Sequence, residues 1–308
     1  MKRAATLAAL SLFALQAQAA AYYVIVAGLG GEPDYEQRFT AAANDLDRIF
    51  KSTGPSAHVV TLQGKQATAA RFRDVMTTVA GEAKVEDDFV LILIGHGSFD
   101  GIEYKFNLVG PDLTAAEIAA ACDRVASRRQ LIVDTTSASG GAISALEKPG
   151  RAVVAATKSG TEKNATVFIR YWIEALQDPS ADTDKSGSVS AIEAFRYATQ
   201  KTAGFYDAEK RLATEHAVFN DVGHGEPVRD AGSGQGLLLG SFTLLRLGGS
   251  QIAVNDPAKR ALLDEKEELE QKIDMLKYRK AAMDPADYKQ QLTEALIELA
   301  QVQEKLDQ

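Results

Sequence analysis

Two short apolar runs, each ending abruptly in small and polar residues, constrain the fold of this chain more than any other feature. The first is LILIGHGSFDG, residues 91–101, and the second is LIVDTTSASGG, residues 131–141. Uninterrupted runs of this length are typical of parallel strands buried on both faces, whose carboxyl ends carry the functional side chains of α/β proteins. The first run delivers His96 and Gly97 to that edge. The second delivers four polar residues: Asp134, Thr135, Thr136 and Ser137.

Strand-like and helix-like segments alternate along most of the chain. This alternation predicts an α/β fold, a three-layer sandwich with a mostly parallel sheet and helices on both faces. The 308 residues, 45% of them hydrophobic, suffice for one large or two modest domains with a packed core. Strands are expected at 22–27, 57–62, 88–95, 129–135, 151–157 and 237–247, and helices at 34–51, 67–81, 114–126, 165–177 and 190–203.

The order of three motifs carries a family resemblance. YYVIVAGLGG at 22–31, followed by Tyr35, precedes the His-Gly of LILIGHGS, which in turn precedes LIVDTT. In this order and strand context the motifs resemble the caspase–legumain clan of cysteine peptidases (peptidase C13-like). LIVDTT is most similar to the Asp-Thr-Cys of the glycosylphosphatidylinositol transamidase catalytic subunit. The resemblance covers roughly residues 22–205 and implies a caspase-like fold, with His96 at the position of the general base.

The nucleophile that this resemblance requires is missing from the sequence. Counted from the strand, the family's cysteine falls on Thr136; counted back from Ser139, it falls on Ser137. We favour Thr136, because the register of a strand is better fixed than that of a loop. A thiol with a pKa near ~8.5 ionises readily beside a histidine. An aliphatic hydroxyl needs a well-placed base and an oxyanion hole, so the replacement favours loss of activity.

The sequence of this chain also differs from the family near the expected substrate pocket. Legumains carry an arginine directly after the tyrosine of the first loop, where this chain has Glu36, with Arg38 two places on. The resemblance therefore does not imply a substrate pocket that is specific for Asn or Asp side chains. Candidate pocket residues are Gly97, Asp134, Glu36 and Arg38.

Residues 182–193, DTDKSGSVSAIE, fit the twelve-residue EF-hand loop. Gly187 supplies the sharp turn and Val189 is expected to pack inward. The alternative is an acidic loop that only caps the helix from Ser190. A single such loop in an exported protein is typical of structural Ca²⁺. The expected ligands are the side chains of Asp182, Asp184 and Ser186, the carbonyl of Ser188, Ser190 through a water, and both oxygens of Glu193.

The N-terminus, residues 1–20, has the pattern of a cleaved secretory signal, with a basic start, a short apolar stretch and Ala17-Gln18-Ala19. The alternative is an uncleaved anchor. Cleavage predicts a periplasmic or secreted protein with no membrane span in the mature chain. The net charge of −8 argues against a nucleic-acid partner. The only cysteine, Cys122, excludes an intramolecular disulfide and reads as a buried apolar residue.

Residues 256–308 differ in composition, being rich in Leu, Glu, Lys, Gln and Ala. Asp284-Pro285 is a helix restart signal between two apolar stripes at helical spacing. The sequence predicts an antiparallel helical hairpin of coiled-coil type. It either packs on its own α/β domain, residues 21–255, or serves as an arm that binds a partner or a second copy.

Together these features predict an exported, catalytically degenerate pseudopeptidase that acts as a binding or scaffold protein in the cell envelope. Such a protein could also serve a neighbouring enzyme as its partner. The competing hypothesis is an active peptidase or other hydrolase that uses Thr136 or Ser137 with His96. No cofactor other than Ca²⁺ is expected.

Overall fold

The structure is a computed structural model that describes residues 19–232, 234–248 and 256–307. Almost all of the predicted signal segment, residues 1–20, lies outside the described residues. A six-stranded sheet forms the centre of the fold, in the order β10-β8-β7-β3-β1-β2. Neighbouring strands of this sheet run parallel to each other, except that β10 runs antiparallel to β8. The strands are β1 (Ala21–Ala27), β2 (Ala57–Leu62), β3 (Asp88–Ile94), β7 (Arg129–Asp134), β8 (Arg151–Ala155) and β10 (Val218–Asn220).

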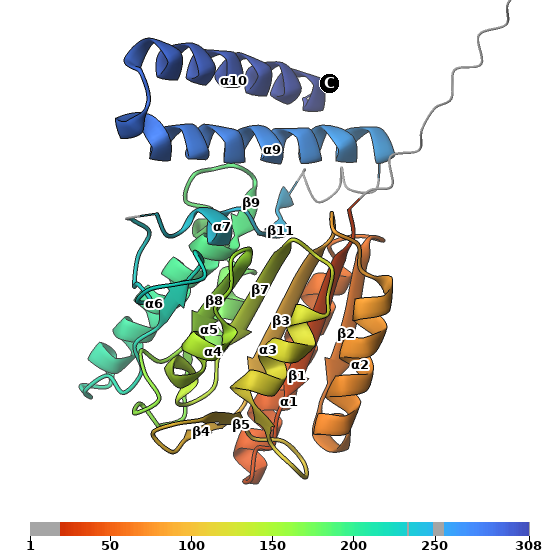
Figure 1. Cartoon of the computed structure of the whole chain (residues 1–308), viewed down its shortest axis with the longest axis vertical. Helices are drawn as coiled ribbons and strands as arrows, with labels where there is room; N and C mark the ends of the chain where they lie inside the picture. The colour runs from red at the N-terminus through yellow and green to blue at the C-terminus, as the bar shows by residue number, and fades with distance from the viewer. Residues whose placement is uncertain (1–18, 233, 249–255, 308) are drawn as a thin grey trace, which may run out of the picture.

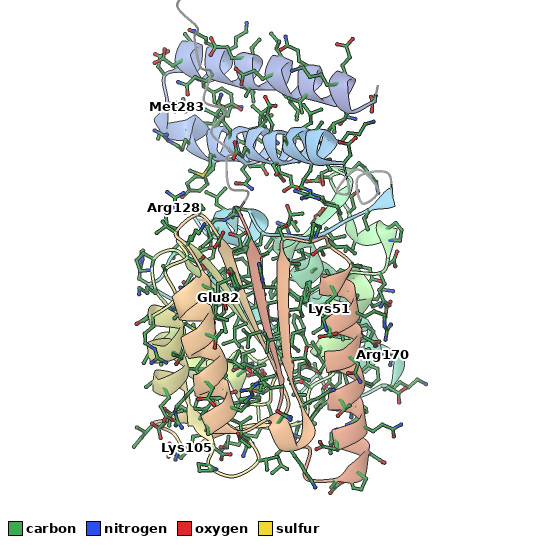
Figure 2. All side chains as sticks on the ribbon, turned by 90° about the vertical axis from the view of Figure 1, so that its right-hand side faces the viewer. Lys51, Glu82, Lys105, Arg128, Arg170 and Met283 are labelled. Carbon is green, nitrogen blue, oxygen red and sulfur yellow. The ribbon has the colours of Figure 1, made fainter. Side chains whose placement is uncertain are left out.

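Helices cover both faces of this sheet (Figure 1). Alternate residues of β1 divide between two apolar cores: Tyr23 and Ile25 pack with one set of helices, and Val24 and Val26 pack with the other. Side chains fill the space between the sheet and its flanking helices (Figure 2). The predicted three-layer α/β sandwich is thus confirmed. The first core includes α1 (Pro33–Lys51), α5 (Phe168–Ala175), α6 (Ala191–Ala208) and α7 (Leu237–Gly240), and the second α2 (Ala69–Glu82), α3 (Ala115–Asp123) and α4 (Ile143–Leu146).

Two small sheets stand outside the central one. The sequence did not predict the first, which begins directly after His96. The second pairs two strands that are far apart in the chain. Their strands are β4 (Gly97–Phe99), β5 (Tyr104–Phe106) and β6 (Leu113–Thr114), and β9 (Ser188–Ser190) with β11 (Thr243–Arg246). Short 3-10 helices complete the chain: η1 (Gly64–Gln66), η2 (Ser139–Ala142), η3 (Pro179–Ala181) and η4 (Lys280–Ala282).

The predicted strand 237–247 is wrong in its first half. Leu237–Gly240 forms the helical turn α7, and only Thr243–Arg246 is a strand. Gly236 has φ of +104°, and its N–H and that of Leu239 both donate to the carboxylate of Asp221. A carboxylate that accepts from the first N–H groups of a helical turn stabilises that turn, so the leucine run curls instead of extending.

The C-terminal helical hairpin is confirmed. Helix α9 (Pro257–Arg279) lies between helix α10 (Pro285–Leu306) and the rest of the molecule (Figure 1). Asp284 caps α10 by accepting from the N–H of Ala286 at 2.8 Å. The helices share a small apolar core of Ile273, Leu276 and Ala295, separate from the cores of the sheet. Among the described residues, no helix is both long and apolar enough to cross a membrane.

Candidate functional site

The loops after β3 and β7 leave neighbouring strands at the same edge of the sheet, because Leu93 pairs with Asp134 in a parallel ladder. Gly95 has φ of +149°, which lets the chain turn sharply before His96. The carbonyl of His96 then accepts from the N–H of Asn107, which starts the small sheet. The structure therefore brings His96 and the polar turn to one edge, as the sequence predicts.

The His96 ring faces the beginning of helix α1. Its centroid lies 4.7 Å from that of Tyr35 and 5.1 Å from that of Phe39, with both contacts edge-on. Burial lowers the pKa of His96, a hydrogen bond with the backbone of Gly30 raises it, and the nearby Arg38 lowers it further. The net shift is downward, so the imidazole is neutral at pH 7.

Ser137 is the hydroxyl that meets the His96–Gly97 turn. Its Oγ accepts from the N–H of Gly97 at 3.1 Å and donates to the carbonyl of Gly97 at 3.0 Å. A Cβ added at Gly97 would lie 2.4 Å from the carbonyl oxygen of Ser137, so only glycine fits this contact. The two loops are thereby joined through backbone groups.

Thr136, the residue favoured by the sequence, also lies beside this turn, because a Cβ added at Gly97 would lie 2.7 Å from its Oγ1. It is fully buried, and its hydroxyl donates to Oδ1 of Asp134 at 2.7 Å and lies 2.6 Å from the hydroxyl of Tyr104. The strand contacts continue to Thr135, the last residue of the expected strand 129–135. Thr135 still donates to the carbonyl of Leu93, both from its N–H at 2.9 Å and from its hydroxyl at 2.8 Å.

Asp134 anchors the turn and does not line a pocket. It is fully buried, and its Oδ1 also accepts from the N–H of Thr136 at 3.1 Å. Burial raises the pKa of this carboxyl to about 6, and the hydrogen bonds from Thr136 and Tyr104 oppose the shift. Its Oδ2 has no hydrogen-bond partner among the described residues.

The two hydroxyls do not form a catalytic dyad with the histidine. No hydrogen bond joins the His96 ring to Thr136 or Ser137 in the part of the chain that the structure describes. Both hydroxyl-bearing side chains also lie below the surface, because Thr136 is fully buried and Ser137 is 3% exposed. A general base must lie within hydrogen-bond reach of the proton that it removes, and the proton of Ser137 is held by a carbonyl.

The remaining candidate pocket residues hold the first loop in place. Oε2 of Glu36 accepts from the N–H of Gly30 at 3.0 Å. The guanidinium of Arg38 lies 5.3 Å from the ring centroid of Tyr35. Cys122 is fully buried in α3, and burial raises the pKa of its thiol to about 12, so it offers no substitute nucleophile.

A second histidine contact at this edge, between His216 and Glu162, was not predicted from the sequence. Nδ1 of His216 lies 2.5 Å from Oε1 of Glu162, whose carbonyl accepts from the N–H of Ala138 at 2.8 Å. This pair fixes the far side of the turn that contains Ser137. His216 stands two residues before the edge strand β10, and the partner residues are too far apart in sequence for any motif to link them.

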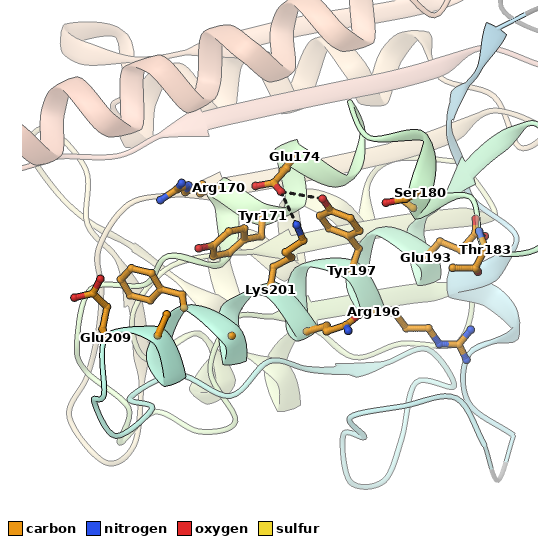
Figure 3. Close-up of a pocket in the computed structure, with 15 residues that line it drawn as sticks. Arg170, Tyr171, Glu174, Ser180, Thr183, Glu193, Arg196, Tyr197, Lys201 and Glu209 are labelled. Carbon is orange, nitrogen blue, oxygen red and sulfur yellow. Dashed lines mark hydrogen bonds and ion pairs between the residues drawn. The ribbon is translucent and has the colours of Figure 1, made fainter.

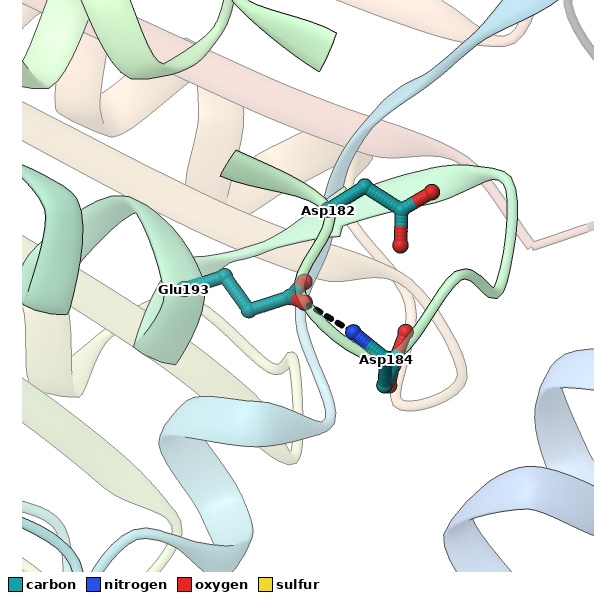
Figure 4. A group of neighbouring side chains, drawn as sticks. All are labelled: Asp182, Asp184 and Glu193. Carbon is teal, nitrogen blue, oxygen red and sulfur yellow. Dashed lines mark hydrogen bonds between the residues drawn. The ribbon is translucent and has the colours of Figure 1, made fainter. Parts of the chain in front are cut away.

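The predicted calcium loop gathers three carboxylates (Figure 4). One oxygen each of Asp182, Asp184 and Glu193 lies within 4.8 Å of the others, and among the described residues this is the one acidic, histidine or cysteine group of that kind. Gly187 has φ of +85°, as the turn requires. Val189 is fully buried.

Hydrogen bonds give the loop its shape. Oδ1 and Oδ2 of Asp182 accept from the N–H groups of Ser186 at 3.0 Å and Gly187 at 3.1 Å. Oε2 of Glu193 accepts from the N–H of Ser190 at 2.9 Å and from its hydroxyl at 2.7 Å, which starts helix α6. The hydroxyls of Ser186 and Ser188 lie 3.1 Å apart. All six predicted ligand residues therefore lie in one compact loop of oxygen donors.

A hollow of about 840 Å³ lies beside this loop, between helices α5 and α6 (Figure 3). The hydroxyl oxygen of Tyr197 lies 2.8 Å from a carboxylate oxygen of Glu174 and 2.7 Å from one of Asp178, and Lys201 pairs with Glu174 at 3.0 Å. Burial and these carboxylates raise the pKa of Tyr197 to about 12. Because these groups bond to one another, they connect the helices on either side of the calcium loop.

No protein-family model matches the chain, and no curated protein matches it. Among solved structures the chain is similar to the Drosophila initiator caspase Dronc, with a TM-score of 0.44 and 10% sequence identity, covering 68% of this chain and 82% of that chain. It is also similar to protein GSU0716 from Geobacter sulfurreducens, with a TM-score of 0.49 and 14% identity, covering 75% of this chain and 100% of that chain.

Proposed function

We propose that this protein is an exported pseudopeptidase with a caspase-like body, stabilised by calcium, that acts as a binding or scaffold protein in the cell envelope. The observation that carries the proposal is the state of the two hydroxyls at the nucleophile position. Ser137 is bonded to both backbone groups of Gly97, and Thr136 is buried against Asp134 and Tyr104. The signal-like pattern of residues 1–20 supports export to the periplasm or the medium.

The chemistry of hydroxyl groups supports the loss of activity. A serine attacks a carbonyl only when a base takes its proton as the bond forms. The Ser137 proton is directed to the carbonyl of Gly97, and the neutral His96 ring packs against Tyr35 and Phe39. Attack would require both loops to rearrange, so the ground-state geometry opposes turnover.

Calcium binding is part of the proposal because the loop offers the ligands that this ion prefers. Calcium takes six to eight oxygen ligands from carboxylates, carbonyls and hydroxyls or waters. The carboxylates of Asp182, Asp184 and Glu193 approach within 4.8 Å, where like charges repel, and a divalent cation would remove that repulsion. The ion would then stabilise the folded state by mass action.

The hairpin provides the surface for a partner in this proposal. The neighbouring side chains of Leu296 and Ile297 on α10 are 48% and 54% exposed. Light scattering of the full chain should reveal self-association, if a second copy is the partner. Replacing both residues with glutamate should then restore a monomer, whereas the same change at the exposed position Gln291 should have no effect.

One observation favours the competing hydrolase hypothesis. The N–H of Gly97 lies 3.1 Å from Oγ of Ser137 and could stabilise an oxyanion once Ser137 moves. Purified protein should be assayed against a pool of fluorogenic peptides together with His96→Ala, Ser137→Ala and a control variant, His224→Ala. We expect all four to give the same background. Wild-type turnover that falls more than about 100-fold in both site variants but not in the control would establish the hydrolase instead.

A further inference from the structure

We infer that the calcium loop and helix α9 form one coupled unit, in which calcium binding strengthens the docking of the α9–α10 hairpin on the α/β body. The inference rests on the calcium site of the proposed function and adds a regulatory role to it. Helix α9 runs across β9 and β11, next to the loop (Figure 1). Two separate sets of contacts connect the loop to this helix.

The first set is direct. Nζ of Lys266 on α9 donates to the carbonyl of Ser186 in the loop at 2.5 Å and lies 3.7 Å from Oε1 of Glu270. Burial raises the pKa of the Glu270 carboxyl to about 7; Lys266 opposes the shift, and Asp184 of the loop adds to it. Because the Lys266 ammonium contacts both the Ser186 carbonyl and Glu270, the carboxyl of Glu270 lies beside the loop.

The second set passes through the β9–β11 ladder. Arg246 of β11 pairs with Ser188, the residue whose carbonyl is the expected seventh-position ligand. The Arg246 side chain donates to Glu267 at 2.8 Å and to Asp264 at 2.7 Å, both on α9. The carbonyl of Gly187 accepts from the N–H of the residue after Arg246 at 2.8 Å. An ion that orders the loop would thus also fix the arginine that holds α9.

Charged side chains join the hairpin to the body through hydrogen bonds from Lys266 to Ser186 and from Arg246 to Glu267, so a change of charge can alter this interface. The apolar cluster of Ile273, Leu276 and Ala295 lies within the hairpin and is separate from the two cores of the body. A hollow of about 1060 Å³ separates part of α9 from the amino ends of β1 and β3. Interfaces of this kind permit relative motion between parts of a chain.

The sign of the coupling follows from the charges. Near the loop, α9 carries the carboxylates of Asp264, Glu267 and Glu270 and the ammonium of Lys266. Calcium changes the charge of the three loop carboxylates plus ion from −3 to −1, which weakens the repulsion of Glu270. The less negative loop also attracts the Lys266 ammonium less strongly, but Lys266 still pairs with Glu270 on its own helix. Coupling of binding free energies is reciprocal, so a docked hairpin must also raise the calcium affinity.

Hydrogen exchange on the full chain tests the docking directly. Millimolar calcium should slow exchange of the α9 amides several-fold, and more than exchange of the α2 amides on the far side of the sheet. Glu193→Gln should abolish the difference. If calcium binds to wild type but α9 and α2 respond alike, the coupling is overturned while the calcium site stands.

Calorimetric titration tests the reciprocal effect. Asp264→Asn with Glu267→Gln removes the partners of Arg246 without touching the loop, and should weaken calcium binding about three- to ten-fold. Glu298→Gln, which breaks the exposed 3.4 Å pair with Lys272, is the control and should leave the affinity unchanged. If the double variant does not fold, Glu267→Gln alone should show a smaller loss. Unchanged affinity in these variants contradicts the coupling, and no heat with wild type contradicts both it and the calcium site.

Discussion

The turn after β7, residues 134–139, and the loop before α6, residues 182–193, contain similar residue types but differ in what their polar groups contact. In the turn, the hydroxyls of Thr136 and Ser137 bond to protein groups. In the loop, Asp182 and Glu193 also accept from backbone N–H groups, but one oxygen each of three carboxylates converges within 4.8 Å, where like charges repel.

This difference shows why polar composition alone does not define a site. A buried hydroxyl with satisfied hydrogen bonds contributes to stability, and moving it to a substrate would leave its partners unpaired. Carboxylates that converge repel one another, and a bound cation reduces this repulsion. The hydrogen bonds of the turn after β7 favour rigidity, and the converging carboxylates of the loop before α6 are the reason for proposing a bound cation there.

The largest expected effect concerns Asp134. Its pKa is raised from 3.8 to about 6, so its stabilising contribution is present below about pH 4 and is lost as the pH rises through 6. The loss corresponds to roughly 3 kcal/mol. Denaturant unfolding at several pH values should show the stability of wild type falling by this amount relative to Asp134→Asn, which cannot ionise. Asp74→Asn, on the exposed face of α2, is the control. A wild-type-to-variant difference that stays constant with pH would show that Asp134 is not the buried acid described here.

The next largest effect concerns calcium. At a calcium concentration about 100 times the Kd, the unfolding free energy should rise by about 2.7 kcal/mol. Thermal melts with calcium and with chelator measure it. Glu193→Gln should remove the gain, and Glu209→Gln at the other end of α6 should retain it. Identical melting temperatures with calcium and chelator would reduce the loop to a helix cap.

Restoring a thiol compares the two nucleophile registers. A thiol-reactive peptide probe should label Ser137→Cys at least about tenfold faster than Thr136→Cys. The Ser137 side chain bonds to backbone groups of Gly97, whereas the Thr136 side chain is fully buried against the carboxyl of Asp134, which disfavours a thiolate. Mass spectrometry of the labelled protein measures both rates, with wild type as the background. Faster labelling of Thr136→Cys would return the register to the one that the strand pattern favoured.

The smallest effect concerns Ser190. Ser190→Ala removes the hydroxyl that donates to Glu193 at 2.7 Å and should cost about 1 kcal/mol, in the range of a lost helix cap. Melts in chelator isolate this capping role from any role in binding the ion. Ser241→Ala, which also removes a hydroxyl bonded locally, to the carbonyl of Leu238, is the matched comparison. Loss of the whole calcium response in Ser190→Ala would mean that this side chain binds the ion more directly than expected.

Features encoded by neighbouring residues could be read from the sequence. The apolar runs ending at His96 and Asp134 identified two adjacent strands, and Asp284-Pro285 identified the start of α10, because burial and capping depend on local pattern. The convergence of Asp182, Asp184 and Glu193 could be predicted for the same reason, because all three lie within twelve residues.

Features set by contacts between distant segments could not be read. The partners of the two hydroxyls come from distant segments: Thr136 contacts the hydroxyl of Tyr104, and Ser137 bonds to backbone groups of Gly97. The helical turn at 237–240 depends on Asp221. Lys266 reaches Ser186 across 80 positions of sequence, and no periodic pattern records such a pairing.

Because Cys122 is buried, cysteines introduced at the surface can be labelled selectively without first replacing the native one. Its thiol is fully buried with a pKa of about 12, so maleimide dyes and nitroxide spin labels would bypass it. Two cysteines introduced at exposed positions, one at Gln291 on α10 and one at Arg71 on α2, would therefore be the only sites to take a label. Energy transfer or electron–electron resonance between them would report the position of the hairpin without first replacing a native residue.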